Sequence, residues 1–143
     1  AADRHAQEHD VADRVHFHAV DAGDASLDGR YDLVTAFECI HDMPDPVSAL
    51  RTMKRLAGDD GLVVVMDEKV SESFSPDADE VERLMYGFSN FICLPDGMAH
   101  SHSVGTGTVM RPHTLRGYAR QAGFDDIAIL PIETDFWRFY RLL

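Results

Sequence analysis

The feature that most constrains this chain is the stretch from Tyr31 to Pro46, which reads YDLVTAFECIHDMPDP. Its apolar run, residues 33–37, is rich in strand-forming residues and too short for a useful helix. Four functional side chains follow at once: Glu38, Cys39, His41 and Asp42. Residues 43–46 then stop the strand and begin a helix. A strand that ends in polar groups and turns into a helix is how open α/β sheets form ligand crevices.

The other segments alternate between helical and strand patterns. We expect helices over residues 2–9, 46–57, 77–91 and 112–121, and strands over residues 15–20, 31–37, 62–66, 127–130 and 135–141. Asp45 is placed to cap the second helix, and Gly58 and Gly123 follow helix ends, where glycine is favoured. The continuous apolar run of residues 62–66 predicts a strand covered on both faces. The order predicts an α/β fold with a parallel sheet and a C-terminal antiparallel hairpin, joined by a long loop over residues 94–111.

Composition narrows the class of protein. The chain has 13 basic and 25 acidic residues, a net charge of −12, so we expect no nucleic-acid partner. No stretch approaches the roughly 20 apolar residues of a membrane-spanning helix, so we expect no membrane partner. Cys39 and Cys93 lack any CxxC spacing, which indicates free thiols and a cytoplasmic protein.

Eight histidines raise the question of a metal site. Three pairs lie two or four residues apart: His5 with His9, His16 with His18, and His100 with His102. Zinc needs three or four converging ligands, and the chain has neither an HExxH motif nor a close cysteine pair. We therefore expect surface histidines and no metal. A GxSxG hydrolase motif is also absent.

Several segments together resemble the class I S-adenosylmethionine-dependent methyltransferases. Asp21-Ala22 follows an alternating strand, and Asp32-Leu33-Val34 leads into Ile40-His41-Asp42-Met43-Pro44-Asp45-Pro46. Members of that family often carry a leucine-histidine-histidine-leucine-proline run where this chain has residues 40–44. The turn and strand of residues 58–68, the Gln121-Ala122-Gly123-Phe124 helix end and the terminal hairpin fit as well. The resemblance implies a Rossmann-like doubly wound sheet, S-adenosylmethionine as cofactor and a small-molecule methyl acceptor.

The chain departs from the family in one respect. No GxGxG loop precedes Val15, although that loop and an acidic residue on the next strand hold the family's cofactor. The resemblance thus implies that residues 1–143 are the C-terminal portion of a single methyltransferase-like domain, lacking its first two strands. Such a portion would be inactive alone and would leave sheet edges exposed. We expect pairing through those edges or with a preceding N-terminal segment.

The resemblance also places the site. Asp21 would accept a hydrogen bond from the adenine amine while Ala22 lines the ring, with Asp24 as the alternative acid; an ordinary turn-forming Asp21 remains open. Backbone carbonyls of Phe37 and Glu38 would meet the methionine amine. His41 would contact the cofactor or act as a catalytic base, or else only pack on the next helix.

Substrate contacts are expected after residue 68, where the family varies. The candidates are Tyr86, Phe91, Met98, His100 and His102, although aromatic residues at helical spacing also suit a core. Two other functions remain open. The missing glycine loop permits a non-catalytic regulatory or assembly domain, and a dehydrogenase remnant would bind NAD instead. The His-Asp-Met-Pro-Asp-Pro stretch fits the dehydrogenase poorly.

Overall fold

The computed structural model describes residues 1–143 and contains one four-stranded sheet. Its strands are β1 (Leu33–Phe37), β2 (Leu62–Glu68), β3 (Ile127–Ile129) and β4 (Trp137–Leu142), in the order β1-β2-β4-β3. β1 and β2 are parallel, and β4 runs antiparallel between β2 and β3. A parallel pair followed by an antiparallel hairpin confirms the predicted partial Rossmann-like fold.

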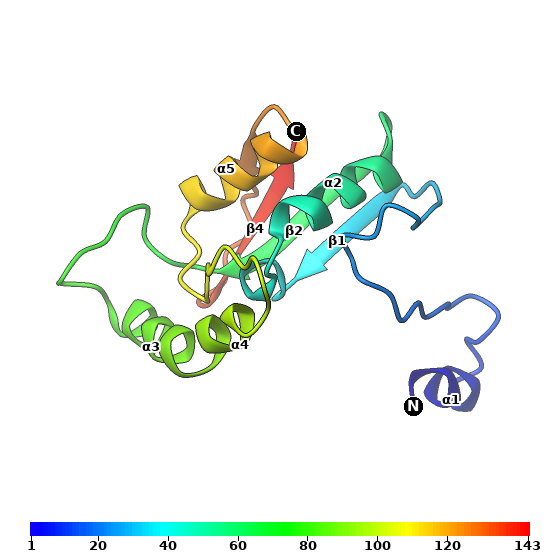
Figure 1. Ribbon diagram of the computed structural model, residues 1–143, viewed down its shortest axis with the longest axis horizontal. Coiled ribbons are helices and arrows are strands. Elements are labelled where there is room, and N and C mark those ends of the chain that lie inside the picture. Colours follow the sequence, from blue (N-terminus) through cyan, green and yellow to red (C-terminus); the bar gives the residue numbers. More distant parts are fainter.

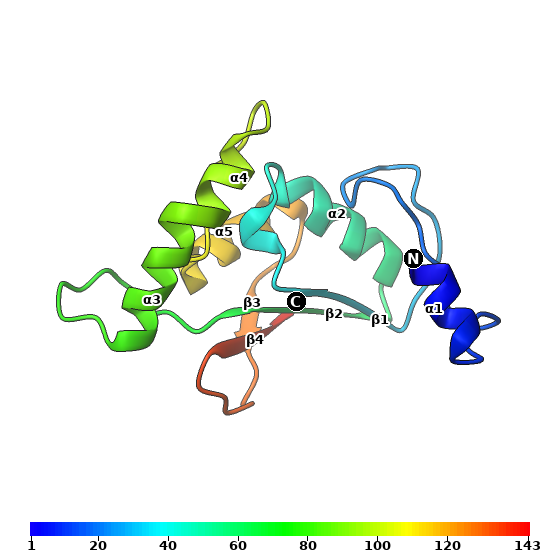
Figure 2. The same ribbon diagram turned by 90° about the horizontal axis from the view of Figure 1, so that it is seen from below.

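The main helices lie on one face of this sheet (Figures 1 and 2). They are α2 (Pro46–Ala57), which joins β1 to β2, and α5 (Pro112–Ala122), which precedes β3. Beyond the carboxyl ends of β1 and β2 lie α3 (Glu80–Phe88), a π-helical turn (Ser89–Cys93) and α4 (Leu94–Met98), and α1 (Ala2–Glu8) lies on the opposite side of the molecule. None of the helices is long and apolar enough to cross a membrane.

The predicted helix ends are confirmed. Asp45 caps α2 by accepting a hydrogen bond from the Ser48 backbone N–H at 3.0 Å. Gly58 ends the same helix at φ +64°, a conformation that side-chain-bearing residues rarely adopt. Gly123 ends α5 in the left-handed region at φ +99°. These stops direct the chain into β2 and toward β3.

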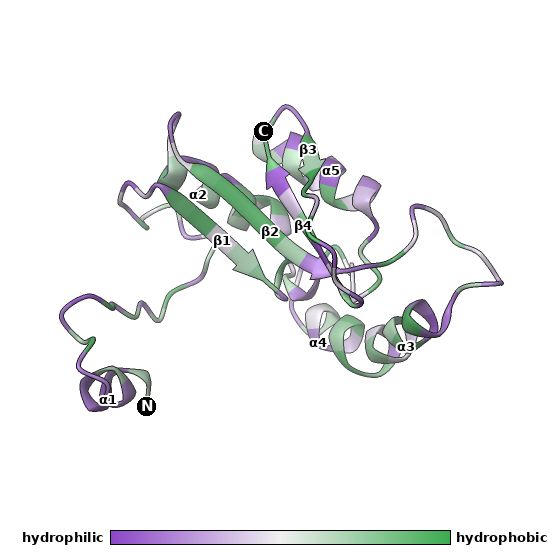
Figure 3. Ribbon diagram, turned by 180° about the vertical axis from the view of Figure 1, so that it is seen from behind, coloured by the Kyte–Doolittle hydropathy of each residue, from purple (hydrophilic) through white to green (hydrophobic).

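The core lies between the sheet and the helices α2 and α5. Leu50, Val65 and Leu115 are completely buried there, and Tyr140 is almost so. The other face of the sheet has no helix over it, and in Figure 3, which is seen from that side, the ribbons of β1 and β2 are mostly green for hydrophobic residues. Leu33 is 54% exposed and Leu62 41%. The prediction that residues 62–66 are covered on both faces is therefore wrong, because both main helices pack on the same side.

Two other segment predictions need correction. Residues 15–20 form no strand: Val15, Phe17 and Val20 are all exposed, and β1 pairs with β2 alone. Alternation specifies a strand only when a neighbour supplies backbone hydrogen bonds. The helix predicted over residues 77–91 begins later and continues through the π turn and α4, so the long loop begins after Met98.

Candidate functional site

A cluster of ionisable side chains lies at the carboxyl ends of β1 and β2. A short 3₁₀ turn after β1, Ile40–Asp42, positions His41, while Asp67 and Glu68 end β2. His41 Nδ1 lies 2.8 Å from an Asp67 carboxylate oxygen and 3.2 Å from a Glu68 oxygen. His41 Nε2 lies 3.2 Å from Asp42. His41, Asp67 and Glu68 are buried, so the histidine faces two carboxylates away from water and a third, Asp42, that is partly exposed.

The environment shifts the pKa values of this cluster. Burial lowers the pKa of His41, but the hydrogen bond and charge of Asp67, with Glu68 and Asp42, raise it overall to about 10. Burial and the neighbouring Asp67 raise the pKa of Glu68 well above its usual value. Burial, followed by the charge of Asp67, raises the pKa of Glu38 to about 7. Such concentrated shifts are typical of functional sites.

Glu38 is also unusual in its backbone. It follows β1 directly and adopts φ +55°, a conformation that is costly for a residue with a side chain. Its N–H donates to the Met66 carbonyl at 3.0 Å, so the strained residue is held in place by β2. Its carboxylate oxygen Oε1 is buried without a hydrogen-bond partner. Strain of this kind, kept at the end of a strand, often accompanies function.

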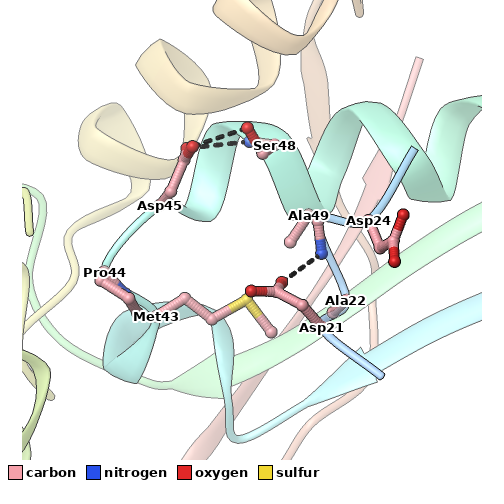
Figure 4. A pocket seen from close by; sticks show the side chains of 9 residues that line it. Asp21, Ala22, Asp24, Met43, Pro44, Asp45, Ser48 and Ala49 are labelled. Carbon is pink, nitrogen blue, oxygen red and sulfur yellow. Dashed lines mark hydrogen bonds between the residues drawn. The ribbon is translucent and has the colours of Figure 1, made fainter. Parts of the chain in front are cut away.

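A cavity of about 450 Å³ lies between the loop of residues 21–24 and the beginning of α2 (Figure 4). Its lining residues are Asp21, Ala22, Gly23, Asp24, Met43, Pro44, Asp45, Ser48 and Ala49. Asp21 accepts a hydrogen bond from the Gly23 N–H at 2.7 Å, so the turn-forming role left open by the sequence is present. The same carboxylate borders the cavity, so the turn and a ligand contact are compatible.

The structure brings together part of the predicted cofactor site. Asp21, Ala22 and Asp24 share the cavity, whereas Phe37, Glu38 and His41 do not line it. The Phe37 ring instead meets Phe139 edge-on, with ring centres 6.3 Å apart. The two halves are connected along the chain, because residues 38–42 lead directly into Met43 and Pro44 of the cavity wall.

The predicted substrate residues are dispersed. The Tyr86 hydroxyl accepts a hydrogen bond from Arg111 at 2.8 Å. Phe91 is 85% exposed and Met98 62%, and both histidines of the following loop, His100 and His102, are also exposed. None of the five main cavities is lined by any of these residues.

Sequence reasoning missed four polar residues that the fold buries. Asp67 and Glu68 face His41, and Glu82 forms an ion pair with Arg111 at 2.8 Å. The pattern of acids directly after the apolar run of residues 62–66 could have found the first two, because parallel strands end at one edge of a sheet. The Arg111–Glu82 pair joins α3 to the residue directly before α5, and no local pattern predicts it.

The fold is a Rossmann-like α/β domain with a cluster of ionisable side chains at the carboxyl ends of its parallel strands. A family model described as a methyltransferase domain matches residues 2–129. This chain therefore belongs to the methyltransferase domain family. A search of curated proteins gives no significant match.

Solved structures share the fold at low sequence identity. An O-methyltransferase family protein from Burkholderia thailandensis is 17% identical at a TM-score of 0.66, over 99% of this chain and 39% of its own. Another is the O-methyltransferase NcsB1 of neocarzinostatin biosynthesis, which was solved with S-adenosylmethionine and 2-hydroxy-5-methyl naphthoic acid. It is 20% identical at a TM-score of 0.67, and the match covers 99% of this chain and 37% of NcsB1. The mitomycin 7-O-methyltransferase MmcR is 15% identical at a TM-score of 0.66, and the match covers 99% of this chain and 37% of MmcR. This chain spans less than half of each of these structures.

Proposed function

We propose that this chain forms the C-terminal part of an S-adenosylmethionine-dependent methyltransferase that acts on a hydroxyl group of a small molecule. One observation carries the proposal: residues 38–44 connect the strained, ionisable end of β1 to the cavity bordered by Asp21. A cofactor with a nucleoside at one end and an amino acid at the other could place its nucleoside in the cavity and its amino acid beside the end of β1. The NcsB1 structure holds S-adenosylmethionine and a naphthoic acid, which supports both the proposed cofactor and a small-molecule acceptor.

In this proposal the cavity holds the nucleoside end of the cofactor. The Asp21 carboxylate accepts from the adenine amine, and Ala22 and Met43 supply apolar contact to the ring. Phe37 and Glu38 offer backbone carbonyls to the amino group of the methionine end. The buried acids around His41 give this end a negative potential, which favours an ammonium or sulfonium group.

Methyl transfer is a direct displacement, in which the acceptor oxygen forms a bond to the methyl carbon as the carbon–sulfur bond breaks. The sulfur keeps the electron pair, and the acceptor hydroxyl loses its proton. The chain must align these atoms and exclude water. His41 is predominantly protonated at neutral pH because its pKa is about 10, so it acts as a hydrogen-bond donor. Glu38, whose pKa is about 7, is better suited to accept the proton.

We further propose that tight cofactor binding requires a longer polypeptide. The additional residues would supply the glycine loop and pair with the free edge of β1, and the protein would act in the cytoplasm. β1 has one hydrogen-bonded neighbour, and its apolar side chain Leu33 is 54% exposed. The proposed acceptor-side residues come from the segment formed by α3, the π-helical turn, α4 and the following loop: Tyr86, Phe91, Met98, His100 and His102.

Calorimetric titration of S-adenosylmethionine into this chain and into a longer native polypeptide tests the proposal. We expect the longer form to bind at least 100-fold more tightly. Absence of binding by both forms would contradict it and would favour the regulatory or assembly domain. Binding of NAD in place of S-adenosylmethionine would instead identify a dehydrogenase remnant.

A further inference from the structure

The segment of α3, the π-helical turn and α4 lies beyond the carboxyl ends of β1 and β2, next to the ionisable cluster (Figures 1 and 2). The Sγ atom of Cys93, at the end of the π-helical turn, lies within 4.8 Å of a ring nitrogen of His41 and a carboxylate oxygen of Asp42. A Cβ atom added at Gly97 of α4 would lie 3.1 Å from the Asp42 carbonyl oxygen, so this helix touches the 3₁₀ turn. Movement of the segment would therefore uncover the cluster on one side.

The segment of residues 80–98 has little apolar attachment to the rest of the domain. None of the buried residues of the main core lies in it. Within α3 only Glu82 and Met85 are buried, whereas Leu84 and Phe88 are exposed. The chain forms no helix or strand over residues 69–79 before the segment or residues 99–111 after it. Segments with few buried apolar contacts are those that open locally while the core stays folded.

A buried polar junction holds this segment to the domain. Glu82 accepts hydrogen bonds at both carboxylate oxygens, one from Arg111 at 2.8 Å and one from the Ser71 backbone N–H at 2.9 Å. The Arg111 guanidinium also donates to the Ser71 carbonyl at 2.6 Å and to the Tyr86 hydroxyl at 2.8 Å. The junction thus connects α3 with the chain that leaves β2 and with the residue directly before α5.

We propose that residues 80–98 form a lid that opens as a unit over the ends of β1 and β2, and that the Arg111–Glu82 pair is its latch. The pair suits this role because each buried charge is compensated only while the other is in place. When the two charges separate, both regain water, and this hydration offsets part of the lost attraction. As the cover of a methyl-acceptor site the lid rests on the function proposed above, whereas its opening depends on no ligand.

Native-state amide hydrogen exchange in increasing urea, followed by NMR, measures the opening. Local opening exposes less surface than global unfolding, and the urea dependence of a free energy scales with the surface exposed. We therefore expect the protected amides of residues 82–98 to share one opening with a weaker urea dependence than the amides of β2. The same urea dependence and the same protection in both segments would show that residues 80–98 open only by global unfolding, and would overturn the proposal.

Arg111→Met tests the latch. This variant should speed exchange in residues 82–98 at least about 30-fold, because Glu82 loses its partner in the closed state. Arg116→Met is the matched control, since it removes another arginine–carboxylate pair, Arg116 with Asp126 at 2.9 Å, from a partly exposed site in α5. The control should change the same rates less than about 3-fold. Equal acceleration by the two variants would overturn the latch.

A milder variant and the parent chain keep the proposal testable if Arg111→Met does not fold. Glu82→Gln keeps the shape of the side chain but removes its charge, and it should speed the same amides at least about 5-fold. Unchanged exchange in this variant would contradict the latch. None of these rates requires a cofactor, so a failure of S-adenosylmethionine binding would refute the proposed function without affecting the lid.

Discussion

The pKa of Glu38 makes a quantitative prediction about stability and pH. Glu38 has a folded-state pKa of about 7 against an ordinary value of 4.5. The folded state therefore holds this proton more tightly than the unfolded state. Its contribution to stability is fully present below pH 4.5 and is lost as the pH rises through about 7.

The magnitude follows from the size of the shift. A shift of about 2.5 pKa units corresponds to about 3.4 kcal/mol if the group is fully shielded. Glu38 is only partly buried, so solvent screening reduces the expected contribution to about 1–2 kcal/mol. Glu38→Gln keeps the side-chain shape and the positive φ but removes the titration. Between about pH 5 and pH 8, the parent chain should thus lose about 1–2 kcal/mol more of its unfolding free energy than the variant.

Urea unfolding at several pH values measures this difference. Titration of His41 and Glu68 occurs in both proteins and largely cancels in the comparison. Glu133→Gln is the matched control, because the side chain of Glu133 is 95% exposed, and its pH profile should follow that of the parent chain. Parallel profiles for the parent and Glu38→Gln would refute the reasoning that burial beside Asp67 holds the proton on Glu38.

Three further substitutions test the cofactor site, the α3–α5 connection and the core. Asp21→Ala should weaken S-adenosylmethionine binding by about 1–3 kcal/mol in the form that binds it, through loss of an acceptor, and unchanged affinity in calorimetry would reject that role. Arg111→Met should cost about 3–5 kcal/mol in urea unfolding because it leaves Glu82 buried without its partner. Adding Glu82→Leu should restore at least half of that loss, and simple additivity of the two effects would argue against a coupled pair. Leu50→Ala should cost about 2–5 kcal/mol in the same assay. Leu62, on the open face of the sheet, is the comparison: if Leu62→Ala cost more than Leu50→Ala, the placement of the core would be wrong.

Local patterns predicted the elements whose stability is largely local. Asp45 and Gly58 flank the two ends of α2 as expected, because an N-cap and a glycine with positive φ at the helix end depend on neighbouring residues alone. The strand predicted over residues 15–20 failed for the opposite reason. Its alternation is real, but a strand also needs a partner, and β1 offers residues 15–20 no hydrogen bonds.

The candidate site shows the same division. Glu38 and His41 follow a strand directly, so the sequence could place them at the edge of the sheet. Their partners Asp67 and Glu68 end another strand about 26 residues away, and the pairing of β1 with β2 determines that they meet. The sequence therefore predicts which side chains reach the crevice, whereas pKa shifts and the ion pair of His41 depend on tertiary contacts.

The proposed cofactor crevice is tested most directly by amide chemical-shift mapping with S-adenosylhomocysteine, which NMR can follow even when this chain binds weakly. We predict shifts concentrated in residues 21–24 and 38–45, the two segments that border the cavity and end β1. Shifts spread elsewhere, or none at saturating ligand, would contradict the assignment of this crevice to a sulfur-linked nucleoside.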